Sequence, residues 1–89
     1  MPKFFLEHTF GKEFFERPQA EIDKDFKAAK ANSTTDAYWV KSYLVPELGK
    51  IYCEWDAKDA ESIKQVFSKT GTPYDKITET KIVFSEDFR

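Results

Sequence analysis

The side chains best suited to hold a metal ion are His8, Cys53 and Glu54. Imidazole and thiolate bind zinc, nickel or copper, and the thiol has to lose its proton to do so. His8 and Cys53 fall in two expected strands that would be neighbours in a sheet, so a suitable register would place them together. The alternative is structural. A cysteine between Ile51 and Trp55 is a small buried hydrophobe, and one backbone carbonyl satisfies a lone histidine.

A second group of polar and aromatic side chains suggests a ligand cleft on the other side of the same strands. It consists of Glu7, Lys41, Tyr43 and Tyr52. A carboxylate in a partly dry cleft has a raised pKa and is suited to general acid or base catalysis. Glu54 is expected on the same side as Glu7, and Lys41 is either a cation for an anionic ligand or a salt-bridge partner of these two carboxylates. The structural alternative places the carboxylates at the solvated rim of an interface.

A β-hairpin from Tyr38 to Trp55 is expected to position most of these groups. Two runs rich in aromatic and β-branched residues flank the turn sequence Pro46-Glu47-Leu48-Gly49. Because side chains alternate along a strand, one face of the first run should carry Trp39, Lys41, Tyr43 and Val45. The other face should carry Tyr38, Val40, Ser42 and Leu44. Neither face is polar, so the hairpin needs a cover on both sides.

The remaining elements follow from periodicity and turn residues. A strand is expected over Lys3 to Phe10, followed by a loop or single turn over Lys12 to Arg17 that carries two Phe rings. Pro18 suits the first turn of a helix whose apolar stripe is Ile22, Phe26 and Ala29. Asp56 or Asp59 caps a second helix that ends at Gly71. The last strand is expected over Lys76 to Phe84.

This order, β-α-β-β-α-β, predicts a single ferredoxin-like α+β domain over residues 1–89. Right-handed crossovers give a four-stranded antiparallel sheet in the order 4-1-3-2, with both helices on one face. The other face stays bare although Phe5, Tyr52 and part of the hairpin place large groups on it. Such a patch usually marks an interface, so we expect a homodimer that covers this face, with a cleft at the interface.

Composition narrows the class of protein. The chain has 89 residues, a net charge of -2 with both signs interspersed, and 17% aromatic residues. No basic surface for nucleic acid or an anionic membrane is expected. The chain has one cysteine, which cannot form an internal disulfide. We expect neither a secretory signal before Phe4-Phe5-Leu6 nor a membrane-spanning segment. These features favour a location in the cytoplasm. Phosphate-binding glycine loops, Cys-x-x-Cys pairs and nucleophile elbows do not occur.

The hairpin and the second helix resemble a family of small bacterial ferredoxin-like proteins of unknown function, some of whose members are described as nickel-binding. The resemblance rests on Trp39 followed by Ser42-Tyr43, on Gly49-Lys50 leading to Tyr52-Cys53, on the helix start from Ala57 to Ile63, and on Gly71-x-Pro73-x-Asp75-x-Ile77. It covers the first strand and the chain from Trp39 to about Thr80. It implies the ferredoxin-like fold and a divalent metal, nickel or zinc.

Carried over residue by residue, the resemblance leaves an incomplete metal site. Relatives described as nickel-binding have histidines at positions that correspond here to Lys41, Val66 and Thr72. None of these three offers a donor comparable to imidazole. His8, Cys53 and Glu54 remain as the matching donors.

The sequence therefore predicts a small dimeric protein that binds a small ligand or a metal ion. The alternative is a cofactor-free dimeric α/β-barrel enzyme of oxygenase or isomerase type, an argument from the fold alone. In that case His8, Glu54 and Tyr52 are the acid–base candidates.

Overall fold

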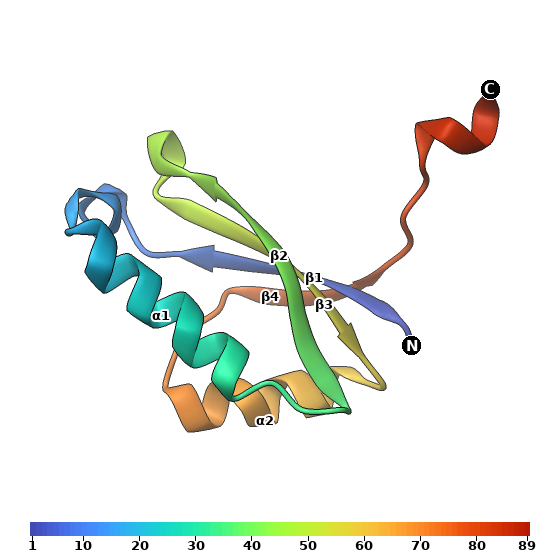
Figure 1. The fold of residues 1–89 in the computed structure, drawn as a ribbon, viewed down its shortest axis with the longest axis horizontal. Helices are drawn as coiled ribbons and strands as arrows, with labels where there is room; N and C mark the ends of the chain where they lie inside the picture. The colour runs from blue at the N-terminus through green and yellow to red at the C-terminus, as the bar shows by residue number, and fades with distance from the viewer.

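The computed structural model describes all residues 1–89. Its strands and helices are β1 (Lys3–Thr9), α1 (Gln19–Ala31), β2 (Ala37–Val45), β3 (Lys50–Ala57), α2 (Ala60–Thr70) and β4 (Lys76–Thr80). The strands form one sheet in the order β2-β3-β1-β4, in which all neighbours are antiparallel. Both helices cover the same face (Figure 1). The ferredoxin-like fold and its strand order are confirmed.

The register separates the two faces of the sheet. Leu6 lies opposite Cys53 and His8 opposite Ile51, so these four side chains share the face that the helices cover. The opposite face, which we call the open face, carries Glu7 with Tyr52 and Lys41 with Glu54. Neither helix has the length and apolar character needed to cross a membrane.

Trp39 is on the other side of the sheet from the one that alternation predicts. It lies opposite Trp55, whereas Lys41 lies opposite Glu54, and the register shifts between Trp39 and Lys41. A bulge adds one residue to a strand and reverses the side chains on one side of it. Trp39 therefore packs on the helix side together with Ser42, while Lys41 stays on the open face.

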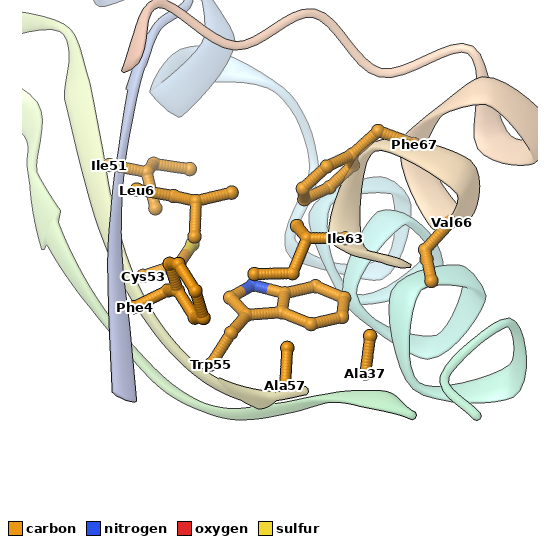
Figure 2. Close-up of a cluster of buried hydrophobic side chains, with 10 residues drawn as sticks. All are labelled: Phe4, Leu6, Ala37, Ile51, Cys53, Trp55, Ala57, Ile63, Val66 and Phe67. Carbon is orange, nitrogen blue, oxygen red and sulfur yellow. The ribbon is translucent and has the colours of Figure 1, made fainter. Parts of the chain in front are cut away.

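The hydrophobic core lies between the sheet and α2 (Figure 2). Trp55 is its largest fully buried side chain and meets Phe67 of α2 edge-on, with ring centroids 5.2 Å apart. The other buried members are Phe4, Leu6, Ala37, Ile51, Cys53, Ala57, Ile63 and Val66. α1 contributes less, because Ile22 is its one buried residue.

The second helix begins and ends as its sequence predicts. The Asp59 side chain accepts hydrogen bonds from the backbone N–H and the hydroxyl of Ser62 at 2.8 and 2.7 Å, so Asp59 is the N-cap. Asp56, the other candidate cap, lies within β3 and pairs with Lys3. Gly71 ends the helix with a left-handed backbone (φ 71°).

The last strand is shorter than predicted. It ends at Thr80 and not at Phe84, because Thr80 lies opposite Lys3, the first residue of β1. Beyond this point no neighbouring strand is left to accept backbone hydrogen bonds. We call residues Lys81–Arg89 the C-terminal arm. All of its residues are exposed, and it includes a short 3-10 helix, Ser85–Phe88.

The segment before α1 folds as a single turn, as expected. Lys12–Glu16 forms a short 3-10 helix. Phe14 stacks on Phe10 at 4.8 Å and meets Phe15 edge-on at 5.1 Å. Both rings pack against the edge of the core. This turn therefore forms one wall of the space between the sheet and α1.

Candidate ligand-binding pocket

A cavity of about 310 Å³ lies between the helix side of the sheet and the helix layer. Its walls are mainly aromatic, from Phe10, Phe14, Phe26, Trp39, Trp55 and Phe67. The lining reaches the surface at Arg17, which is half-buried, and at Asp25, which is exposed; the two form an ion pair at 2.9 Å. On the α1 side, Phe26 stacks on Trp39 of β2 with ring centroids 5.4 Å apart, and both rings line the cavity.

His8 is buried in the wall of this pocket. Its Nδ1 lies 2.9 Å from the backbone oxygen of Pro73. A carbonyl oxygen only accepts hydrogen bonds, so Nδ1 carries the proton and Nε2 keeps its lone pair. Burial lowers the pKa of the imidazole, and the Pro73 carbonyl and the charge of Asp75 oppose that shift only in part. His8 is therefore a neutral side chain with a free acceptor atom.

A chain of three side chains crosses the sheet side of the pocket. Trp39 Nε1 donates to Ser42 Oγ at 2.8 Å, and Ser42 Oγ donates to Cys53 Sγ at 3.0 Å. Burial raises the pKa of the Cys53 thiol to about 11, although the Ser42 hydrogen bond favours the thiolate. Cys53 is therefore protonated near neutral pH. A thiol in this state is a poor nucleophile and has to lose its proton before it binds a metal.

The indole of Trp55 contains a buried donor without a partner. The side chain is 1% exposed, and Nε1 forms no hydrogen bond. Figure 2 shows this nitrogen on the edge of the indole that faces away from Ala37 and Ala57, toward Ile63 and Phe67. A buried unpaired N–H costs about 1–3 kcal/mol. Trp55 lines the pocket, but Nε1 itself is buried next to Ile63 (Figure 2), so an acceptor in the pocket reaches this donor only when the neighbouring side chains shift.

The three predicted metal donors do not come together. His8 and Cys53 share the helix side of the sheet and both line the pocket, but their residues are not directly opposite. Glu54 projects from the open face, where its carboxylate lies 3.4 Å from Lys3 Nζ and 3.9 Å from Lys41 Nζ. No cluster of three or more His, Cys, Asp or Glu side chains suited to a metal ion occurs. The residues present therefore do not fit a complete nickel site within one chain.

The predicted acid–base set is divided in the same way. His8 faces the helices, whereas Glu54 and Tyr52 face the open side of the sheet. β4 pairs with β1 on the side opposite to β3, so it does not bring these side chains together. One substrate molecule in a single chain thus contacts His8 or the other two side chains, but not all three.

The predicted ligand cleft is an open surface in the single chain. Tyr52 stacks on Phe5 at 5.6 Å, and Lys41 Nζ lies 5.6 Å from the centre of the Tyr43 ring. A groove of about 620 Å³ at one end of the open face includes Lys41 but not Glu7, Tyr43 or Tyr52.

Sequence reasoning missed the pocket residues Trp39, Ser42 and Trp55 as functional candidates. Trp39 and Ser42 are three residues apart, and they share the helix side only because of the bulge between them. Without the bulge, strict alternation separates them. The free N–H of Trp55 depends on packing around the ring, and no sequence pattern reports it.

Comparison with known proteins agrees with this fold. The model of a family described as "Nickel responsive protein SCO4226-like" matches residues 4–80. The crystal structure of SCO4226 from Streptomyces coelicolor A3(2) superposes with a TM-score of 0.75 at 19% identity, and the match covers 92% of this chain and 99% of that one. No curated protein matches. The family resemblance of the hairpin and second helix is thus confirmed, and the chain belongs to the SCO4226-like family.

Proposed function

We propose that this chain is a binding protein for a small, neutral, largely aromatic molecule that enters the pocket between the sheet and the helices. The observation that carries the proposal is the cavity with its aromatic lining, which includes Trp55, a residue whose buried N–H is unpaired. Buried polar groups almost always have a hydrogen-bond partner, so this unpaired N–H calls for an explanation. A ligand that accepts a hydrogen bond at this position supplies it.

The size of the pocket limits the ligand. An apolar cavity of about 150 Å³ accommodates benzene, and this pocket holds about 310 Å³. The volume therefore suits a molecule with two fused rings. It also falls at the lower end of the usual range for small-molecule sites, roughly 300–1,000 Å³.

The polar groups of the pocket favour a neutral ligand with one acceptor and one donor. Trp55 Nε1 offers a proton, and His8 Nε2 offers a lone pair. His8 and Cys53 are both uncharged near neutral pH. Arg17 is already paired with Glu21 and Asp25. No unpaired charge thus faces the cavity, and a charged ligand would lose its hydration without compensation.

The proposal is tested with 2-quinolinone, a two-ring molecule with an N–H next to a C=O, and with naphthalene as the apolar control of similar size. Calorimetry and tryptophan fluorescence report binding, because Trp39 and Trp55 both line the pocket. We expect 2-quinolinone to bind about tenfold more tightly than naphthalene, the value of roughly one buried hydrogen bond. Trp55→Phe should reduce this preference, because it removes the donor to the ligand carbonyl and leaves the His8 acceptor in place.

The control variant is Tyr38→Phe, which removes a hydroxyl on the open face that donates to Asp56 at 2.9 Å. It lies outside the pocket and should leave the preference for 2-quinolinone unchanged. Unchanged circular dichroism spectra verify that both variants fold. Failure of 2-quinolinone to bind at millimolar concentration would contradict the proposal, as would equal affinities for the two molecules in the wild type.

Nickel binding is a second candidate, favoured by the description of the family and by the position of His8 and Cys53 on the same pocket. Two protein donors leave further coordination positions to water or another molecule. Titration of the untagged protein with Ni²⁺ separates the candidates. Binding that His8→Asn and Cys53→Ser both remove supports the metal, whereas no heat of binding excludes it.

A cytoplasmic location is part of the same proposal. Its support is the single free cysteine, which is buried and has no partner for a disulfide.

A further inference from the structure

The lining of the pocket reaches the surface at two segments of the chain. One is the start of the helix layer, where Arg17 is half-buried and Asp25 is exposed. The other follows α2, where Gly71 and Pro73 are exposed. The lining residues that belong to the sheet are all buried or half-buried. A molecule therefore enters or leaves the pocket past one of these two segments.

The segment after α2 is fixed to β1 by three hydrogen bonds. His8 Nδ1 donates to the carbonyl oxygen of Pro73 at 2.9 Å, and the Thr9 hydroxyl donates to the Asp75 carboxylate at 2.5 Å. The backbone N–H of Asp75 donates to the carbonyl oxygen of Glu7 at 2.7 Å. Opening the pocket on this side breaks contacts with a central strand of the sheet, so this side forms the fixed rim of the mouth.

The opposite side of the mouth is held by fewer contacts. The turn Lys12–Glu16 has no buried residue, and Ile22 is the one buried residue of α1. No side-chain hydrogen bond caps the N-terminus of either element. Segments with few buried contacts open locally at a much lower free energy than the whole domain unfolds. Opening of the pocket is therefore expected where the turn meets α1.

Arg17 joins the turn to α1 at this point. Its Nη1 donates to the Asp25 carboxylate at 2.9 Å, and its Nε donates to Glu21 at 3.4 Å. The guanidinium carbon lies 5.1 Å from the centre of the Phe14 ring, which is within the range of a cation–π contact. Phe14 and Asp25 both line the pocket. The Arg17 side chain therefore spans the mouth from the turn to the helix.

We propose that Arg17 is the gate of this pocket: its contacts with Phe14 and Asp25 hold the turn Lys12–Glu16 against α1, and their release opens the pocket to solvent. Exposed ion pairs and single cation–π contacts are individually weak, so the gate opens far more often than the domain unfolds. It sets how fast molecules exchange with the pocket. The gate regulates the same pocket that the proposed function uses, but its test needs no ligand.

The thiol of Cys53 reports on opening of the gate. Cys53 lines the pocket, is 7% exposed and is the single cysteine of the chain. The probe is methyl methanethiosulfonate, a small neutral reagent from which the thiolate displaces methanesulfinate to form a mixed disulfide. Mass spectrometry gives the rate at pH 8. We expect Arg17→Gln and Asp25→Asn each to raise this rate by about threefold to tenfold, the order of the weak contacts that they remove.

The two variants separate gating from a change in thiol ionisation. Loss of the Arg17 cation disfavours the Cys53 thiolate, whereas loss of the Asp25 carboxylate favours it. A change in the thiol pKa alone would thus move the two rates in opposite directions, whereas an open gate raises both. Lys27→Gln is the matched control, because Lys27 is an exposed cation on the same helix and lies outside the pocket lining. It should react at the rate of the wild type.

Salt and urea complete the experiment. Raising NaCl from about 0.05 to 1 M should accelerate the wild type but not Arg17→Gln, because salt screens the ion pairs of the gate. Urea well below the unfolding transition should change the rates little, because local opening exposes little surface. The proposal would be overturned by rates that move in opposite directions in the two variants, or that equal the wild-type rate. A steep rise with urea in all of the proteins would also overturn it, since Cys53 would then react only after global unfolding.

Discussion

His8 and Cys53 are the single imidazole and the single thiol of the chain, and burial favours the neutral form of both. Desolvation lowers the pKa of His8 and raises that of Cys53 to about 11. Two residue types that suggest a metal site therefore act here as uncharged groups in an aromatic wall. Their chemistry is set by how much water reaches them, which the identities of the residues do not reveal.

The lowered pKa of His8 predicts a pH dependence of stability. The unfolded chain takes up a proton at the ordinary histidine pKa of about 6.5, whereas the folded chain resists it. The stability that the neutral His8 contributes is thus fully present above about pH 6.5. It is lost as the pH falls from there through the lower pKa of His8 in the folded chain. We expect the free energy of unfolding to be smaller at pH 5.5 than at pH 7.5, measured by urea titration.

His8→Asn is the control for this prediction. The asparagine amide can still donate to the Pro73 carbonyl, which His8 Nδ1 contacts at 2.9 Å, but it has no proton to gain in this range. The variant should be less stable overall and should lose less stability between pH 7.5 and 5.5 than the wild type does. Equal losses in the two proteins would show that carboxylates, not His8, cause the pH dependence.

At the scale of elements, periodicity predicts the strands and helices but not the local irregularities within them. The strands, both helices and the Asp59 cap follow from apolar spacing and turn residues. The bulge after Trp39 was missed, because the extra residue has no sequence mark of its own. The end of β4 at Thr80 was missed, because it depends on where the partner strand β1 begins.

The hairpin turn and the end of β1 depend on each other through Gly49. The N–H groups of Phe10 and Gly11 both donate to the carbonyl oxygen of Gly49, at 2.9 and 3.0 Å. Gly49 has φ 65°, and a Cβ there would lie 2.6 Å from the carbonyl carbon of Gly11. We expect Gly49→Ala to lower the free energy of unfolding by roughly 2–4 kcal/mol, from left-handed strain plus displaced backbone.

Gly71→Ala separates the two causes of this loss. Gly71 also has a left-handed backbone (φ 71°), but a Cβ there has no atom within 4 Å. Gly71→Ala should therefore lower the free energy of unfolding only by the conformational strain, about 1 kcal/mol. Urea titration of both variants at one pH measures the difference. Equal costs would mean that the contact with Gly11 relaxes without a penalty.

For the whole molecule, the sequence predicted a layer of helices on a sheet, but it did not predict the cavity that the single chain forms between these two layers. The predicted cleft residues Glu7, Tyr43 and Tyr52 lie on the open face without enclosing a cavity. The cavity lies on the helix side, where α2 has four buried residues and α1 has one. Such a difference in packing between two amphipathic helices depends on side chains from the whole domain.

The same view of the molecule predicts that the C-terminal arm contributes to the expected homodimer but not to the fold of one chain. No residue of Lys81–Arg89 is buried, and the sheet ends at Thr80. A chain that stops at Thr80 should therefore have the same free energy of unfolding at 1 µM as the full chain, within about 0.5 kcal/mol. At 100 µM the full chain should unfold at a higher temperature, because association stabilises the folded state by mass action. Differential scanning calorimetry at both concentrations checks this. A truncated chain that is already less stable at 1 µM would place the arm within the fold of the monomer instead.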